Sequence, residues 1–174
     1  MSFAAYTSAL VVRQGASGDW LHFRLPPILY LNTALLIASS LTLELGRRSA
    51  VRGRPRPDAD VISFPAPVWR TAAWVDATLA LGALFVLGQL VAWRQLAAQG
   101  LYLATNPSSA FFYILTALHA LHLLGGVVGL LYVRHRLRSD GGPGVGPAFG
   151  AASLYWHFMT LLWIYLLVLL AVRL

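Results

Sequence analysis

Four apolar stretches of membrane-spanning length constrain the fold of this chain more than any other feature of its sequence. They cover residues 27–45, 72–97, 110–133 and 151–172. A helix needs roughly 20 apolar residues to cross a hydrocarbon core about 30 Å thick. Because 58% of the residues are hydrophobic and 11% are charged, the chain cannot form the surface of a water-soluble protein. The sequence therefore predicts an all-α integral membrane bundle.

The connections between these stretches are too short for a soluble domain, so we expect residues 1–174 to form a single transmembrane domain. Residues 1–12 are also apolar but rise only about 18 Å as a helix, short of a full span. We therefore expect four full transmembrane helices plus a partial first helix. We expect either that its first half is missing from this sequence or comes from another subunit, or that the segment lies partly in the membrane interface. The segment has no basic region or cleavage site typical of an export signal. Cysteine is absent, which excludes disulfides, thiolate metal sites and cysteine nucleophiles.

The basic residues predict the orientation in the membrane. All 13 are arginines, and nine of them fall within residues 47–70 and 134–138. By the positive-inside rule we expect these two loops on the cytoplasmic side of an inner or plasma membrane, with the C-terminus outside. The net charge of +7 fits contact with anionic lipid headgroups. We expect no nucleic-acid partner, because no basic surface with interleaved aromatic residues lies outside the spans.

The end of the first full span carries local signals. Gly46 followed by Arg47 and Arg48 predicts that the helix ends there, because glycine favours a helix C-terminus and arginine complements the helix dipole. Glu44 lies within one turn of both arginines. We interpret it as one partner of an interfacial ion pair, with proton handling as the alternative.

Two amides inside the spans are expected to contact other helices. Asn32 lies near the start of the first full span, and Gln89 lies deep in the second. Such an amide more often links two helices than binds a substrate. The same spans contain glycines, which allow helix backbones to approach closely. These glycines are at positions 82, 88, 125, 126 and 129.

Three histidines lie inside the apolar stretches: His119, His122 and His157. An ionisable group in hydrocarbon costs a few kcal/mol without a partner, so each is a functional-site hypothesis. Imidazole is a common ligand of haem and metals. However, the histidines differ in depth, at about 10 Å for His157, 16 Å for His122 and 21 Å for His119, and no nearby carboxylate completes a metal site. We therefore assign no catalytic, cofactor-binding or metal-binding residue.

Motifs in the same order on four consecutive spans indicate a family. They are Leu31-Asn32-Thr33-Ala34-Leu35 with Ser39-Ser40, Leu81-Gly82 with Phe85 and Gln89, Thr116-x-x-His119-x-x-His122, and Tyr155-Trp156-His157-Phe158 with Trp163. In this the chain resembles the short, five-span form of subunit III of haem-copper cytochrome c oxidases. The sequence departs from that family at Ala92-Trp93, where Glu-Tyr is frequent, and at Met159-Thr160, where Val-Asp is frequent. The family's first-span Ser-Glu pair would precede Met1.

The resemblance implies a non-catalytic subunit of an aerobic, proton-pumping terminal oxidase, without a redox centre of its own. Its partners would be subunits I and II, which would hold the haem and copper, and membrane phospholipid bound in a cleft between its helices. Under this interpretation the histidines are not metal ligands. The residues that we predict as lipid or helix contacts are Asn32, Gln89, His119, His122, Tyr155, Trp156 and His157.

Other functions stay open on the sequence alone. Within the same family, a quinol oxidase subunit III or a nitric oxide reductase accessory subunit would share these motifs. In a different class, an independent haem-binding membrane cytochrome would use the histidines as ligands. A small transporter ranks last, because the sequence shows no paired broken helices and no repeat symmetry.

Overall fold

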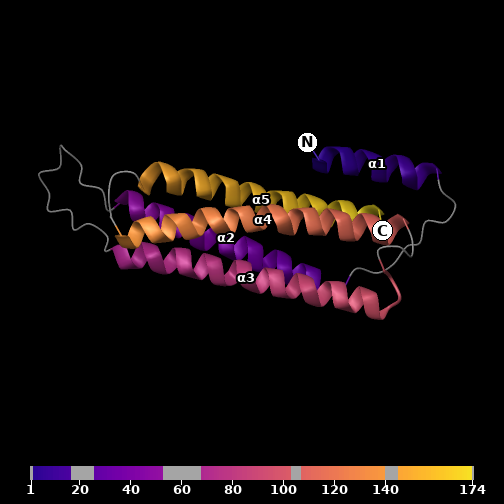
Figure 1. Cartoon of the computed structure of the whole chain (residues 1–174), viewed down its shortest axis with the longest axis horizontal. Helices are drawn as coiled ribbons and strands as arrows, with labels where there is room; N and C mark the ends of the chain where they lie inside the picture. Colours follow the sequence, from indigo (N-terminus) through magenta and orange to yellow (C-terminus); the bar gives the residue numbers. More distant parts are fainter. Residues whose placement is uncertain (1, 17–25, 53–67, 103–106, 140–144, 174) are drawn as a thin grey trace, which may run out of the picture.

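The computed structural model describes residues 2–16, 26–52, 68–102, 107–139 and 145–173. These residues form five helices and no strand. The helices are α1 (Ser2–Ala16), α2 (Ile28–Arg52), α3 (Val68–Ala98), α4 (Pro107–Ser139) and α5 (Val145–Arg173). Helices α2 to α5 run alternately up and down, and the short α1 lies along one half of the α4 and α5 pair (Figure 1).

Helices α2 to α5 are each long and apolar enough to cross a membrane. This confirms the prediction of an all-α bundle with four full transmembrane helices, and α1, with 15 residues, confirms the shorter first helix. The chain is a multi-pass membrane protein. Every spanning helix extends beyond its predicted apolar stretch, because backbone hydrogen bonding continues through the charged or less apolar turns at which the hydropathy signal ends.

The predicted helix end at Gly46 is wrong, because α2 continues to Arg52. Gly46 is buried, and a β-carbon added there would lie 2.9 Å from the Cβ of Trp74 on α3. The glycine therefore permits close contact between α2 and α3. The predicted ion pair is confirmed: Glu44 accepts hydrogen bonds from Arg47 at 2.7 Å and from Arg48 at 2.8 Å.

A glycine does terminate α3. Gly100 has a φ of 77°, a conformation that glycine adopts without steric penalty. Its amide donates to the Ala97 carbonyl at 3.0 Å, and the Leu101 amide donates to the Leu96 carbonyl at 3.1 Å. This pair of hydrogen bonds is a Schellman motif, which satisfies the last carbonyls of the helix. The chain thereby turns back towards the start of α4.

Helices α2 and α3 form the most extensive contact in the bundle. Thr42 and Thr78 hydroxyls are 2.9 Å apart, and near the other end Asn32 Nδ2 donates to Gln89 Oε1 at 3.5 Å. A β-carbon at Gly88 would lie 2.0 Å from Oδ1 of Asn32. The absence of a side chain at Gly88 therefore sets how closely the two helices approach.

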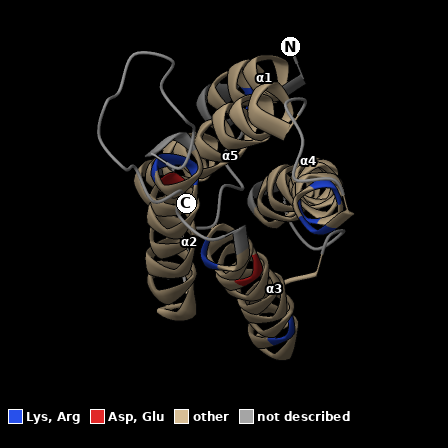
Figure 2. Cartoon of the chain, turned by 90° about the vertical axis from the view of Figure 1, so that its left-hand side faces the viewer, with Lys and Arg blue, Asp and Glu red and all other residues tan. Residues whose placement is uncertain are grey.

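Charged side chains collect at one end of the bundle, shown facing the viewer in Figure 2. Glu44 on α2 pairs with its neighbouring arginines there. Asp76 on α3 pairs with two arginines near the end of α4. This is the end that carries most of the arginines of the described chain.

We expect Gly88→Ala to destabilise the bundle by about 1–3 kcal/mol, because the added methyl group overlaps the buried Asn32 side chain. The control is Gly150→Ala, where a β-carbon meets nothing within 4 Å, and which should be neutral or slightly stabilising. Unfolding of the purified chain in detergent would measure both. An equal loss for the two variants would contradict the packing role of Gly88.

Candidate functional site

Trp156 on α5 contacts the three other spanning helices with one fully buried side chain. Its indole lies between Gly82 on α3 and Gly126 on α4. A β-carbon at Gly82 would lie 3.0 Å from Cη2, and one at Gly126 would lie 3.1 Å from Cε3. Nε1 donates to the Ser39 hydroxyl of α2 at 3.0 Å. Both glycines thus leave room for the indole, and Ser39 satisfies its only polar atom.

Trp163 repeats this arrangement two turns further along α5. Seven residues correspond to nearly two helical turns, so the two tryptophans share one face. Trp163 Nε1 donates to the Thr33 hydroxyl of α2 at 3.0 Å. Its ring packs edge-on against Phe85 of α3, with ring centroids 4.9 Å apart. It also packs, in a tilted arrangement, against His119 of α4, with centroids 5.0 Å apart. Trp163 therefore also contacts three helices.

His119 is fully buried among aromatic rings. Its imidazole lies 5.9 Å from the Phe85 ring, measured between centroids, besides its contact with Trp163. Within the described residues, neither ring nitrogen has a hydrogen-bond partner. The same holds for Asn32 Oδ1 and Gln89 Nε2, although these two side chains bond to each other through their remaining amide atoms.

His122 lies where α1, α4 and α5 meet. Its Nδ1 donates to the Leu118 carbonyl of its own helix at 2.8 Å, and its ring centroid is 5.3 Å from that of Phe3 on α1. The Tyr155 hydroxyl of α5 donates to the His122 carbonyl at 2.9 Å. This histidine therefore contributes both its ring and its backbone to contacts between helices.

His157 turns towards α2 instead. Its Nδ1 is hydrogen-bonded to the Ser40 hydroxyl, and its Nε2 lies 3.9 Å from a carboxylate oxygen of Glu44. His119 thus faces an aromatic interior, His122 faces α1, and His157 faces α2. Among the described residues, no group of three or more histidine or acidic side chains is placed to hold a metal ion.

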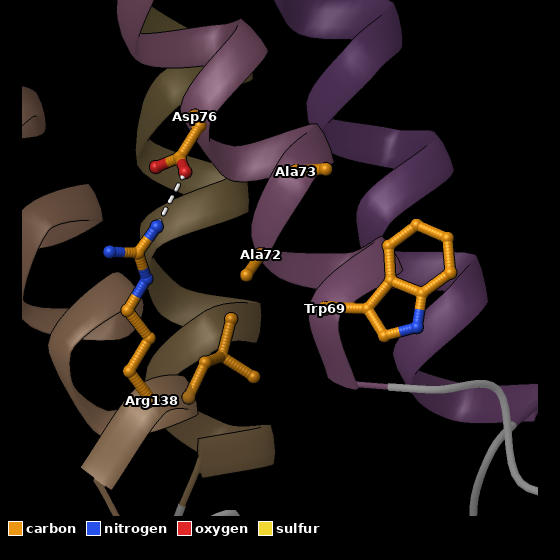
Figure 3. Close-up of a pocket in the computed structure, with 6 residues that line it drawn as sticks. Trp69, Ala72, Ala73, Asp76 and Arg138 are labelled. Carbon is orange, nitrogen blue, oxygen red and sulfur yellow. Dashed lines mark hydrogen bonds and ion pairs between the residues drawn. The ribbon is translucent and has the colours of Figure 1, made fainter.

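An ion-pair cluster joins α3 and α4, and the sequence did not predict it. Asp76 pairs with Arg134 and accepts a hydrogen bond from Arg138 at 2.9 Å. Figure 3 shows the Arg138 guanidinium directed at the Asp76 carboxylate. Both side chains line a cavity of about 430 Å³. The signal available beforehand was the four-residue spacing of the arginines, which places both on one helix face.

The structure thus joins Asn32 to Gln89, Tyr155 to His122, and His157 to α2, but it does not bring the histidines together. That these residues contact lipid stays a prediction. The partners of the tryptophans and of His157 are not among the residues predicted as lipid or helix contacts, although the sequence analysis expected Gly82 and Gly126 to allow close approach of helices. Those partners are Thr33, Ser39, Ser40, Gly82 and Gly126.

Comparison with known proteins gives consistent matches. The family model for cytochrome c oxidase subunit III matches residues 21–172. A probable cytochrome c oxidase subunit 3 of Mycobacterium bovis is 32% identical, over 93% of this chain and 74% of the relative. The corresponding protein of Mycobacterium leprae is 35% identical with the same coverage. A cytochrome c oxidase subunit 3 of Synechocystis is 32% identical over 80% of this chain and 54% of the relative.

We expect Trp156→Phe and Ser39→Ala each to destabilise the chain by about 1 kcal/mol, and the double variant to lose little more than either. Each change removes the same interhelical hydrogen bond, while phenylalanine keeps a ring between the glycines. Unfolding in detergent would give the coupling energy. Trp69→Phe, at a side chain that is 70% exposed, is the control and should be neutral. If the stability losses of the two single variants add up in the double variant, the hydrogen bond between the two side chains does not contribute to stability.

We expect Asp76→Asn to destabilise the chain by up to about 1 kcal/mol, because it leaves Arg134 and Arg138 facing each other without a carboxylate. The loss should shrink in about 0.5 M salt, since these side chains are partly exposed and screened. Adding Arg138→Gln should restore part of the stability by removing the repulsion. A loss that neither salt nor the second substitution changes would show that charge is not its cause.

Proposed function

The chain belongs to the cytochrome c oxidase subunit III family and is a subunit of a haem-copper oxidase complex, and we propose that it performs no redox step there but stabilises the catalytic subunit. Its direct partners would be subunits I and II, in which the haem and copper would bind. The complex would transfer electrons from cytochrome c to O2 and translocate protons. The bundle would form a single transmembrane domain that supports this activity by packing and by retaining phospholipid.

One observation carries this proposal: several polar side chains inside the described spans form hydrogen bonds between helices. The indoles of Trp156 and Trp163 bond to hydroxyls of α2, and Tyr155 bonds to the α4 backbone. In a bilayer, such hydrogen bonds and close contacts hold helices together. The bundle is therefore suited to act as a rigid packing surface.

The alternatives receive no comparable support. The matching family and relatives carry the name of cytochrome c oxidase subunit 3, which does not favour a quinol oxidase or nitric oxide reductase subunit. A haem cytochrome with bis-histidine ligation, one histidine from each of two helices, would need two of these side chains directed at one iron. His119, His122 and His157 instead contact Trp163, Phe3 and Ser40.

The charge distribution supports an orientation. The described arginine clusters of α2 and α4 lie at the same end of the bundle, and the C-terminus lies at the other (Figures 1 and 2). By the positive-inside rule, the cluster end would be cytoplasmic and the C-terminus outside, in an inner or plasma membrane. Bound phospholipid would contact exposed aromatic side chains of α5, such as Phe158 and Tyr155, the latter bonded to the His122 carbonyl.

We expect an affinity-tagged chain, solubilised gently from its native membrane, to co-purify with a large haem-bearing subunit. After dissociation, the visible haem spectrum should leave the tagged chain. His122→Ala and His157→Ala should lower the yield of associated subunits or shorten the oxidase lifetime without changing the haem bands, because they loosen helix contacts and remove no ligand.

The control for these variants is His135→Ala, at an exposed histidine near the end of α4, which should leave association unchanged. A haem spectrum that stays with the isolated chain, or a haem band lost from an assembled variant, would overturn the proposed function.

A further inference from the structure

A second cavity, of about 370 Å³, lies at the opposite end of the α3 and α4 pair from the Asp76 cluster. Four of its lining residues follow one face of α3, and two tyrosines complete it from the α3–α4 turn and from α4. The lining residues are Leu90, Trp93, Arg94, Ala97, Tyr102 and Tyr113. The face from Leu90 to Ala97 covers about 10 Å along the helix axis.

Hydrogen bonds fix the residues of the cavity wall in place, and none of these bonds involves Arg94. The Tyr113 hydroxyl donates to the Leu101 carbonyl at 2.9 Å, which ties α4 to the Schellman turn of α3. Trp93 Nε1 donates to the Thr116 hydroxyl at 3.1 Å, and the Ser109 hydroxyl donates to the Tyr102 carbonyl at 2.7 Å. The aromatic part of the cavity is therefore preorganised.

Arg94 lies at the boundary between the hydrocarbon core and the lipid headgroups when α3 is centred in the membrane. The spanning segment Trp69–Ala98 has 30 residues, whereas about 20 residues of helix cross the hydrocarbon core. Centring the segment leaves roughly five residues beyond each side of the core. Arg94 precedes Ala98 by four residues and thus lies at the hydrocarbon boundary, where tryptophan and tyrosine are also enriched.

No described carboxylate is available to Arg94. The two acidic residues in the described part of the chain, Glu44 and Asp76, are both at the other end of the bundle (Figure 2). There they pair with Arg47, Arg48, Arg134 and Arg138. Arg94 is exposed, and its guanidinium therefore remains open to an anion from outside the described chain.

We propose that this cavity binds an anionic phospholipid from the leaflet that faces the α3–α4 connection. The Arg94 guanidinium would pair with the headgroup phosphate, for which its planar donor geometry is suited. Trp93 and Leu90 would contact the glycerol and the upper part of an acyl chain. This binding requires only that α3 span the membrane, whatever the partner subunits are.

The apolar extension of the cavity favours a lipid over other anions. Below Arg94, towards the membrane centre, the lining consists of Trp93 and the 45% exposed Leu90. A phospholipid has hydrocarbon directly below its phosphate. Its phosphate would therefore contact Arg94, and its hydrocarbon would contact the apolar part of the cavity. Inorganic phosphate or a protein carboxylate would match Arg94 alone.

The test is native mass spectrometry of the tagged full chain with its co-purifying subunits, delipidated and titrated with phosphatidylglycerol. We expect Arg94→Gln to weaken phosphatidylglycerol binding at least about tenfold, as loss of a charge-assisted pair implies, and Arg94→Lys to weaken it less. Arg70→Gln, an exposed arginine at the other end of α3, is the matched control and should leave the titration unchanged. Phosphatidylcholine should bind more weakly, and millimolar inorganic phosphate should not compete.

Four results would each overturn the proposal. An equal loss for Arg94→Gln and Arg70→Gln would indicate general attraction of the surface for anionic lipid. Equal binding of phosphatidylcholine would exclude recognition of charge, and displacement by inorganic phosphate would indicate a small-anion site. If Arg94→Gln released another subunit but kept phosphatidylglycerol, the cavity would bind a protein carboxylate.

Discussion

The contact of Trp156 with α2, α3 and α4 is the interaction on which the arrangement of the spanning helices depends. In a bilayer, apolar burial gives helices little reason to associate, because lipid tails solvate apolar side chains as well as a protein interior does. Close packing and interhelical hydrogen bonds must then supply the stability. Trp156 provides both, through its fit between Gly82 and Gly126 and its bond to Ser39.

The same pattern of hydrogen bonds occurs three times among the described residues of the bundle. A hydroxyl donates to a carbonyl three or four residues earlier in its own helix and accepts an indole N–H from another helix. The pairs are Ser39 with Trp156, Thr33 with Trp163, and Thr116 with Trp93. Each hydroxyl and each indole is thereby satisfied without water, which hydrocarbon cannot supply. This explains why serine and threonine occur deep within otherwise apolar helices.

The sequence predicted the number, type and approximate limits of the helices, because membrane-length apolar stretches have few alternative structures. It failed at Gly46, since glycine followed by arginines has the same pattern whether it ends a helix or permits contact with Trp74. It also could not pair Trp156 with Gly82 and Gly126 or Asp76 with Arg134. Such pairs depend on how each helix is rotated about its axis, and sequence gives little information on rotation when both lipid-facing and buried positions are apolar.

Charges near both hydrocarbon boundaries constrain the depth of α3 in the membrane. Asp76 and Arg94 are 18 positions apart in the sequence, which corresponds to about 27 Å of helix and nearly equals the thickness of the hydrocarbon core. A shift of α3 by one turn in either direction would draw one of these charges into hydrocarbon, at a cost of a few kcal/mol. Because α2 packs closely on α3 at Gly46 and Gly88, and Trp156 connects both to the remaining helices, the depth set by α3 also determines the depth of the whole four-helix bundle.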